Sequence, residues 1–477
     1  MSLVTSSPKT SHRWRLRLGE RRVLLLIGDL LLAFIALGLG LYIWFLGQLL
    51  PNFYQFLRVR LPDQSWFLLL PLIWVILLVG LYDPHRAANW RHTLRGVLTA
   101  ALVGLVLYAI LYFTFPPNSL PRRGVAGFVV AASLLTLAWR LLYIRVFTAP
   151  QFMRRVLLVG GGITGQALLQ VFDGLSSPPF HLVGIIDDDE EKIGTHIDGH
   201  EVMGGSERLL SVVLEQNVSD VIVAITGQMR SGMFQALLDA QEQGVEITRM
   251  PVAYEELIGR VPVQYLEADW ILRSFVDVAR VDSFYEMGKR LVDVIGGLVG
   301  VLIFLVLFPF VALAVYLESG RPVVFRQTRA GKGNQPYTII KFRTMRQDAE
   351  KDGAPLLAKE DDERATKVGR LLRKTHLDEW PQFINVLRGE MSLVGPRPER
   401  PELMEHFQRQ IPFYRGRLLV KPGITGWAQV NFGYAASLDE MVQKLEYDLY
   451  YIKHRSILLD LIILLRTVGS VIGFRGQ

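Results

Sequence analysis

The 477-residue sequence predicts a membrane protein in three parts: an N-terminal bundle of four transmembrane helices, a Rossmann-like α/β module and a C-terminal, mostly helical domain. Three observations lead to this prediction. Four long apolar runs come first, a glycine-rich turn follows an apolar strand, and a fifth apolar run is interrupted by proline. We expect the three parts to cover residues 1–150, 151–280 and 281–477, with a re-entrant membrane helix at 291–318.

The composition supports a membrane protein and excludes some chemistry. Half of the residues are hydrophobic and the net charge is +7, which is compatible with either nucleic acid or an anionic membrane. We find no nucleic-acid-binding motif, and the apolar runs favour the membrane. The chain has no cysteine, so disulfides and thiolate chemistry are excluded. The first apolar run is too long for a cleavable signal peptide, and more such runs follow.

Each of the first four apolar runs is near the ~20 residues that cross a bilayer as a helix. They extend roughly from Val23 to Leu49, Trp66 to Tyr82, Val97 to Phe115 and Val125 to Phe147. Arginines precede the first run, occupy the second loop and follow the fourth run, so we expect a cytosolic N-terminus and a return to the cytosol near Gln151. The first and third loops also carry arginines, which makes this bias moderate.

Asp29 lies inside the first apolar run. An acid within a membrane span is a functional candidate by default. The interpretation that we prefer is an acid near the cytosolic interface, within two turns of the start of the helix.

The middle segment predicts alternating strands and helices around Gly160, Gly162 and Gly165, which have G-x-G-x-x-G spacing after an apolar strand. Such a turn lets a pyrophosphate approach the backbone, and Asp187, which ends the second strand, would bind a ribose hydroxyl. We favour a degenerate fold in which the glycines only close a tight turn. The only lysine here is Lys192, so the Tyr-x-x-x-Lys pair of sugar-modifying dehydrogenases is missing. A D-x-D metal site at Asp187 is a weaker alternative.

The fifth apolar run, from Val294 to Leu317, carries no charge and is interrupted by Pro309. Proline breaks a helix by removing a hydrogen bond and clashing with the preceding turn. Basic residues flank the run on both sides, which indicates that both flanks are cytosolic. We therefore expect a helix-break-helix that enters the membrane and returns on the same side. The alternative is a fifth full span.

Further along, Asp378 and Glu379 fall in the first turn of a helix that Thr375 would cap and Gly389 would end. Adjacent carboxylates near a helix N-terminus suit Mg²⁺, which prefers one or two carboxylates together with substrate phosphates. The basic residues that could neutralise a diphosphate there are Arg364, Arg370, Arg373, Lys374 and Arg397. The pattern alone fits equally well an amphipathic helix with solvated charges.

From about Phe284 onward the sequence resembles the bacterial sugar transferase family, the monotopic phosphoglycosyl transferases. The stretches that carry the resemblance are Lys289–Asp293, Lys341–Met345, Leu377–Gln382, Pro396–Pro398, Lys421–Gly426 and Tyr447–Ile452. The whole layout is similar to the long form of this family, the undecaprenyl-phosphate glucose or galactose phosphotransferases of exopolysaccharide or O-antigen synthesis. This chain departs from the family at Phe308, where serine commonly precedes the proline, and at His376, where a small residue is frequent.

The resemblance implies that Asp378 is a nucleophile and Glu379 its partner, that both hold Mg²⁺, and that Lys341, Arg343 and Arg397 position the substrate or brace the site. The implied reaction transfers a hexose-1-phosphate, with glucose expected, from a UDP-sugar to undecaprenyl phosphate through an aspartyl-phosphosugar. The implied location is the bacterial inner membrane, with the catalytic domain on the cytosolic face among inner-membrane lipids. A homodimer stays open. Competing functions are a membrane-bound, NAD-dependent sugar nucleotide dehydratase or epimerase and a non-catalytic scaffold.

Overall fold

A computed structural model of the chain describes residues 18–472 except 49, 83–86, 115–120, 148–152, 176–177, 267–282, 347–363, 434 and 436. The chain divides into two compact units, residues 1–253 and 254–477. Most of the predicted basic N-terminal tail lies outside the described residues.

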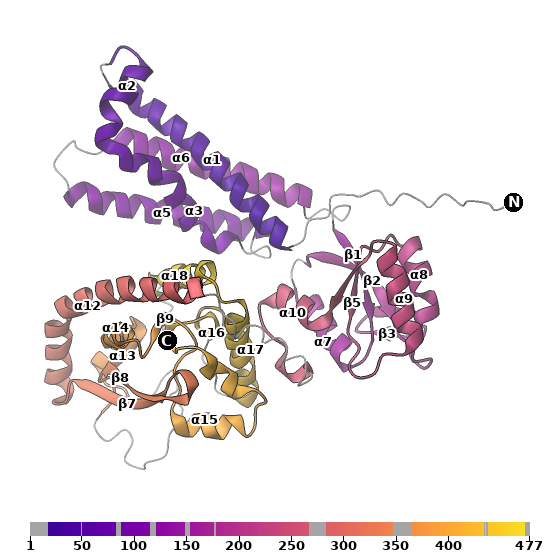
Figure 1. Cartoon of the computed structure of the whole chain (residues 1–477). Helices are drawn as coiled ribbons and strands as arrows, with labels where there is room; N and C mark the ends of the chain where they lie inside the picture. The colour runs from indigo at the N-terminus through magenta and orange to yellow at the C-terminus, as the bar shows by residue number, and fades with distance from the viewer. Residues whose placement is uncertain are drawn as a thin grey trace. The chain divides into compact units, whose positions relative to one another are not determined.

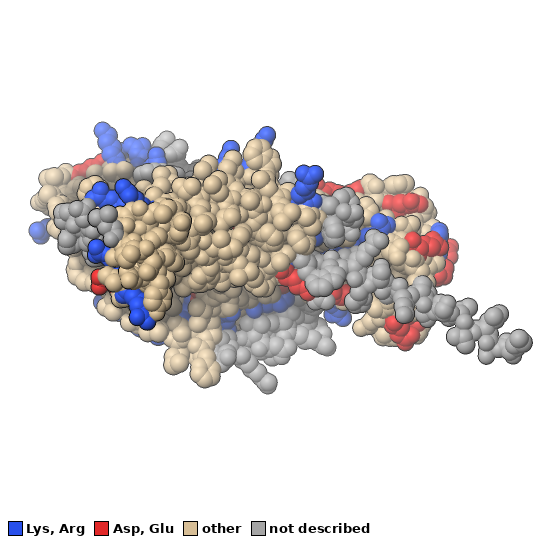
Figure 2. Space-filling model, turned by 90° about the horizontal axis from the view of Figure 1, so that it is seen from above, with Lys and Arg blue, Asp and Glu red and all other residues tan. Residues whose placement is uncertain are grey.

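The N-terminal part is a helical bundle (Figure 1) whose long helices are α1 (Leu18–Leu46), α5 (Trp90–Thr114) and α6 (Arg122–Phe147). Each is long and apolar enough to cross a membrane. The bundle core is rich in aromatic side chains, including Trp44 and Trp74. Many leucines and isoleucines on the outside are exposed, and from above they form part of a broad surface with little charge (Figure 2). These helices therefore have apolar cores and apolar outer faces, as a bilayer requires.

The second predicted span differs from the prediction of one regular helix. The chain forms α2 (Phe53–Arg60), the 3₁₀ helix η1 (Pro62–Leu69) and α3 (Leu70–Leu77), with a bend of 96° after α2. Gln64 has non-helical backbone angles (φ −127°, ψ 35°), and proline begins η1. Eight residues of each helix type extend about 28 Å, close to the ~30 Å hydrocarbon core. The span is thus irregular because proline and the 3₁₀ geometry interrupt it.

The position of Asp29 near the cytosolic interface stays a prediction, but its side chain is one half of a fully buried ion pair. Its Oδ2 accepts a hydrogen bond from Arg140 Nη2 at 2.5 Å, and both side chains are 0% exposed. Arg140 Nη1 also donates to the Leu81 carbonyl at 3.0 Å. The pair connects α1 with α6 and with the end of the irregular span. We interpret Asp29 as a residue that fixes the register of the bundle, because breaking a buried pair leaves an uncompensated charge.

The middle segment is an α/β module, as predicted. Its sheet has the order β3-β4-β2-β1-β5-β6, and every neighbouring pair is parallel except β3–β4. The strands are β1 (Arg154–Val159), β2 (Phe180–Ile186), β3 (His196–Ile197), β4 (His200–Gly204), β5 (Asp220–Val223) and β6 (Glu246–Arg249). Helices α7 (Ile163–Asp173), α8 (Ser206–Glu215) and α9 (Ser231–Glu242) connect them, and α10 (Met250–Ile258) follows. Buried valines, leucines and isoleucines of β1, β2 and β5 pack against α8 and α9.

The second unit is mostly helical and surrounds two small sheets (Figure 1). It contains α12 (Ser283–Ser319), β7 (Val324–Ala330), β8 (Pro336–Phe342), α13 (Lys367–Lys374), η6 (Leu377–Gln382), α14 (Phe383–Arg388), β9 (Ser392–Val394), α15 (Pro401–Gln408), η7 (Tyr414–Leu419), β10 (Gly423–Thr425), α16 (Trp427–Asn431), α17 (Leu438–His454) and α18 (Ile457–Ile472). The expected boundary at residue 280 is displaced in the structure, because Val261 and Val263 belong to the core of this unit.

Helix α12 is one continuous helix with Pro309 inside it, rather than the two helices expected from the sequence. Figure 1 shows that it bends strongly part way along its length. Its N-terminal part contacts β9 and α18, while Arg343 after β8 caps the carbonyls of Ser319 and Gly320 at its C-terminal end. A straight helix of 37 residues would be about 55 Å long. Both ends are nevertheless attached to the same compact unit.

Candidate active site

The Asp378-Glu379 pair lies at a sharp change of chain direction. Thr366 is the N-cap of α13, because its side chain accepts a hydrogen bond from Gly369 N, and Thr375 is the C-cap. His376 then adopts a left-handed conformation (φ 56°) and leads into η6. Thr375 is therefore the C-cap of one helix rather than the predicted N-cap of the next. Gly389 ends α14 with φ 81°, as the sequence predicted.

Asp378 and Glu379 are both buried, at 8% exposed each, but their partners differ. Glu379 Oε1 accepts a hydrogen bond from Lys341 Nζ at 3.0 Å and one from Arg397 Nη2 at 2.7 Å. Among the residues that the structure describes, no basic side chain forms an ion pair with Asp378. The site thus combines one carboxylate that is neutralised within the chain with one that is not.

This asymmetry separates the acidities of the two carboxyl groups. Burial and the charge of Glu379 raise the pKa of Asp378 to about 6. Burial alone would raise the pKa of Glu379 too, but the charges of Arg397 and Lys341 outweigh it and hold that pKa well below its usual range. Two titratable groups with separated pKa values are a common sign of different chemical roles.

The other basic residues that were predicted to bind the diphosphate differ in their contacts and in their distance from the carboxylate pair. Arg373 donates from Nε to Thr344 Oγ1 at 3.2 Å, and its charge lowers the pKa of Asp378. Arg343 instead caps α12 and acts as a brace. Arg364 is half-buried next to an isolated bridge between Met345 and Ala365, and Arg370 is exposed on α13. Lys341, Arg373 and Arg397 are therefore the basic residues nearest to the carboxylate pair.

The glycine turn of the middle module has the backbone expected of a Rossmann-like loop. Gly160 has φ 103°, and a Cβ at Gly165 would overlap the Gly160 carbonyl, so only glycine fits there. The acid after β2 is already bonded within the module, because Asp187 accepts from Gly161 N at 2.7 Å and from Lys192 Nζ at 3.3 Å. Ile197 fills the space beside Gly161.

Lys192 also pairs with Asp189 at 3.2 Å. Asp188 accepts a hydrogen bond from Ser206 N at 2.7 Å, at the start of α8. Within the described part of the chain no group of three or more metal-ligating side chains is found. The acidic turn is therefore occupied by contacts inside the module.

The backbone around Arg397 is held by buried residues that were not predicted individually. Arg417 Nη2 donates to the Arg397 carbonyl at 2.9 Å and pairs through Nε with Asp448 at 2.8 Å. Lys289 donates to the carbonyl of Val394 at 3.0 Å and to the hydroxyl of Tyr451 at 3.0 Å. The signal in the sequence was the Tyr447–Ile452 motif, whose polar residues are unusual in a buried helix.

Two parts of the chain match models of known protein families. Residues 284–474 match the model of the bacterial sugar transferase family, and residues 78–251 match a model described as a CoA-binding domain. The second match begins before the α/β module, within the helical bundle. The residues between the two matches include 254–265, which pack in the second unit.

Similar proteins include three bacterial phosphotransferases. A protein of Aeromonas hydrophila, named UDP-N-acetylgalactosamine-undecaprenyl-phosphate N-acetylgalactosaminephosphotransferase, is 43% identical over 46% of this chain and 50% of its own length. A UDP-glucose:undecaprenyl-phosphate glucose-1-phosphate transferase of Xanthomonas campestris is 28% identical over 84% of this chain and 85% of its own length. A protein of the same name from Caulobacter vibrioides is 42% identical over 39% of this chain and 70% of its own length.

Proposed function

The chain belongs to the bacterial sugar transferase family, and from this premise we propose that it transfers a hexose-1-phosphate from a UDP-sugar to undecaprenyl phosphate. The observation that carries the proposal is the asymmetry of the buried pair: Glu379 holds both cations, whereas Asp378 has no ion pair among the described residues. Glucose is the sugar that we propose, because relatives from Xanthomonas and Caulobacter are named for it. N-acetylgalactosamine, named for the Aeromonas relative, is the competing donor sugar.

In the first step the Asp378 carboxylate attacks the phosphorus next to the sugar. The bond from that phosphorus to the oxygen of the UMP group breaks, and UMP leaves with the electron pair. Burial beside Glu379 raises the pKa of Asp378, whereas Arg397 and Lys341 lower that of Glu379, so Asp378 is the more basic carboxylate of the pair. It is therefore the carboxylate of the pair that we assign as the nucleophile.

In the second step an oxygen of undecaprenyl phosphate attacks the aspartyl phosphosugar. The bond between phosphorus and the Asp378 carboxylate breaks, which restores the enzyme and yields undecaprenyl-diphosphate-sugar. Splitting one transfer into two is the usual advantage of a covalent nucleophile. Lys341 and Arg397 keep Glu379 ionised and in place throughout.

The carboxylate pair also fits a magnesium ion. Asp378 is buried and has no cationic partner among the described residues, and Mg²⁺ is commonly held by one or two carboxylates and substrate phosphates. We propose that Asp378 and Glu379 hold it together with the donor diphosphate. When bound, the ion would neutralise charge on the transferring phosphoryl group.

The attachment of both ends of α12 to one unit supports a re-entrant helix, with the transferase unit wholly on the cytosolic side. The chain has no cysteine, so single cysteines can be labelled cleanly. Glu286→Cys lies near the start of α12 and Thr328→Cys lies on β7 after its end, and both positions are exposed. In intact cells neither should react with an impermeant maleimide from the periplasm. Labelling of Thr328→Cys alone would instead indicate a full span.

The donor half-reaction gives the test of the proposed function. If Asp378 attacks first, purified protein with Mg²⁺ should exchange labelled UMP into UDP-glucose without any lipid. With UDP-glucose labelled in its glucose, adding undecaprenyl phosphate should produce a labelled diphosphate lipid, and chelation of the metal should stop both reactions. If exchange occurs only with UDP-N-acetylgalactosamine, then N-acetylgalactosamine and not glucose is the donor sugar. Lipid product formation without any exchange would favour direct attack by the lipid phosphate and would overturn the covalent step.

A further inference from the structure

Arg397 lies in an irregular segment between β9 and α15, yet the carbonyls of this segment are almost all held. The Pro396 carbonyl accepts from Gly423 N at 2.9 Å. The Pro398 carbonyl accepts from Arg329 at 3.2 Å, and the Glu399 carbonyl accepts from Ala330 N at 3.0 Å. Buried carbonyls need donors, and here the donors come from several separate parts of the chain. The backbone that carries Arg397 is therefore fixed by tertiary contacts rather than by secondary structure.

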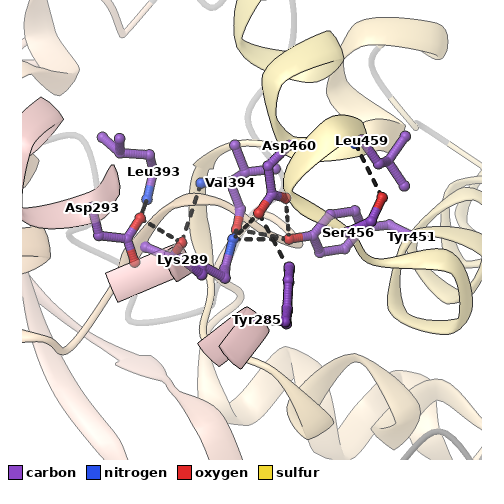
Figure 3. Close-up of polar contacts among 10 residues, drawn as sticks. Tyr285, Lys289, Asp293, Leu393, Val394, Tyr451, Ser456, Leu459 and Asp460 are labelled. Carbon is purple, nitrogen blue, oxygen red and sulfur yellow. Dashed lines mark hydrogen bonds and ion pairs between the residues drawn. The ribbon is translucent and has the colours of Figure 1, made fainter. Parts of the chain in front are cut away.

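The first of two buried clusters holds the carbonyl of Val394, where β9 ends. Lys289 of α12 donates to it at 3.0 Å and also donates to the Tyr451 hydroxyl of α17 at 3.0 Å. Asp460 of α18 fixes both side chains, because it pairs with Lys289 at 2.9 Å and accepts the single hydroxyl proton of Tyr451 at 2.8 Å (Figure 3). Tyr285 also donates to Asp460, at 3.2 Å, but no hydrogen bond joins it to Val394.

The second cluster holds the carbonyl of Arg397 itself. Arg417 donates to it from Nη2 at 2.9 Å. The guanidinium of Arg417 is fixed in turn by Asp448 of α17, at 2.8 Å, and lies 3.6 Å from Glu399. The side chains of Arg417 and Asp448 are 4% and 2% exposed, so this ion pair is dry.

Helix α17 is common to both clusters, because Asp448 and Tyr451 are one turn apart and lie on the same face. Counted over the whole residue, including the backbone, both are 1% exposed. A buried ion pair contributes little to stability compared with apolar residues of the same volume, but it does impose one geometry. Two polar residues at neighbouring buried positions are thus better explained by the geometry that they impose than by the stability that they add.

We propose that Asp448 and Tyr451 are positioning residues that hold the backbone on both sides of Arg397 and so place its guanidinium on Glu379. The inference rests on the proposed function of the Asp378-Glu379 pair. Asp448 acts through Arg417 on the Arg397 carbonyl, and Tyr451 acts through Lys289 on the Val394 carbonyl. Neither touches the carboxylate pair. A displacement of about 1 Å at a catalytic group can cost about 100-fold in rate.

The test is a double-mutant cycle in the UMP-exchange assay, with the full-length protein in lipid nanodiscs. Tyr451→Phe and Asp448→Asn should each lower kcat by about 10- to 100-fold and change KM for the UDP-sugar by less than about threefold. Combined with Arg397→Ala, each should add less than about a twofold loss, because the residue through which they act is gone. Arg397→Lys replaces the alanine variant if activity falls below detection.

Additive losses would overturn the inference. A variant that only reduces the folded fraction lowers the rate by the same factor in either background, so the cycle separates positioning from stability. Tyr285→Phe is the matched control, because the Tyr285 hydroxyl bonds to Asp460 in the same cluster but accepts no hydrogen bond from Lys289, and its kcat should stay within about twofold of wild type. Wild-type rates in Tyr451→Phe and Asp448→Asn would also refute the inference. An inactive wild-type protein would refute the proposed function instead.

Discussion

The glycine turn of the middle module and the Asp-Glu pair of the second unit are both patterns that predict phosphate binding, but the structure treats their acids differently. Asp187 accepts hydrogen bonds from Gly161 and Lys192 of its own module. Asp378 is buried next to a neutralised neighbour and lacks an ion pair among the described residues. The comparison teaches that a motif alone does not define a site. A buried charge that the chain does not neutralise is the more informative sign of a ligand.

Removing each acid should have the largest and the most contrasting effects. Asp378→Asn should lower UMP exchange by about 1,000-fold or more, because an amide is a poor nucleophile. Asp187→Asn should leave exchange within about twofold of wild type, since its contacts are internal to the module. Parallel measurements on the two purified variants test this. Similar losses in both would mean that the glycine turn takes part in the reaction.

A smaller loss is expected from the second carboxylate of the pair. Glu379→Gln keeps an acceptor oxygen but removes the negative charge that pairs with Lys341 and Arg397, so both cations lose their counter-charge. Exchange should fall by about 10- to 100-fold without disappearing, because the nucleophile remains. Saturating Mg²⁺ should recover part of the loss if Glu379 acts through the metal. Complete loss that no metal concentration changes would assign Glu379 a more direct role.

In the α/β module, replacing two nearby glycines by alanine should change the stability by different amounts. A Cβ at Gly165 would overlap the Gly160 carbonyl, whereas nothing lies within 4 Å of a Cβ at Gly162. Gly165→Ala should therefore destabilise the module by about 1–3 kcal/mol, and Gly162→Ala by less than about 1 kcal/mol. Thermal unfolding of the two variants provides the measurement. Equal stabilities would mean that the turn does not approach the strand as closely as described.

Glu446 is a third buried carboxyl group, and the cost of burying its charge can be measured through the pH dependence of stability. Burial raises the pKa of Glu446 to about 7, although Arg260 lies 3.5 Å away. This folded-state pKa is above the unfolded value of about 4.3, so the folded protein binds an extra proton in that window and stability falls as pH rises through it. Glu446→Gln should thus raise Tm by about 2–4 °C at pH 8 and by less than about 1 °C at pH 5. A lower Tm at pH 8 would show that the pairing with Arg260 outweighs burial.

The smallest effect is expected from nucleotides added to the wild-type protein. Because Asp187 and the space beside Gly161 are occupied within the module, NAD and coenzyme A at about 1 mM should shift Tm by less than about 1 °C. Purified protein should also carry no stoichiometric NAD. A shift of several degrees that Lys192→Ala or Ile197→Ala changes would return the module to the dinucleotide-binding class.

Local patterns predicted most of the elements, whereas tertiary contacts decided the details. The glycine turn, its flanking strands and the end of α14 at Gly389 follow from short-range backbone chemistry, and they agree with the structure. Thr375 looked like an N-cap, but the left-handed His376 makes it a C-cap. Two ion pairs could not be predicted from local patterns, because Arg140 is 111 residues from Asp29 and Arg417 is 31 residues from Asp448.

The two attached ends of α12 set how deeply its apolar middle can reach into a bilayer. A transmembrane helix that is not fixed at both ends adjusts its tilt angle when the thickness of the bilayer changes. Since α12 is held through Lys289 at one end and through Ser319 at the other, its reach is fixed by the protein. The long helices of the N-terminal bundle have no such constraint on length. Thinning the host bilayer should therefore increase the tilt of α1, α5 and α6 while leaving the immersion depth of α12 unchanged.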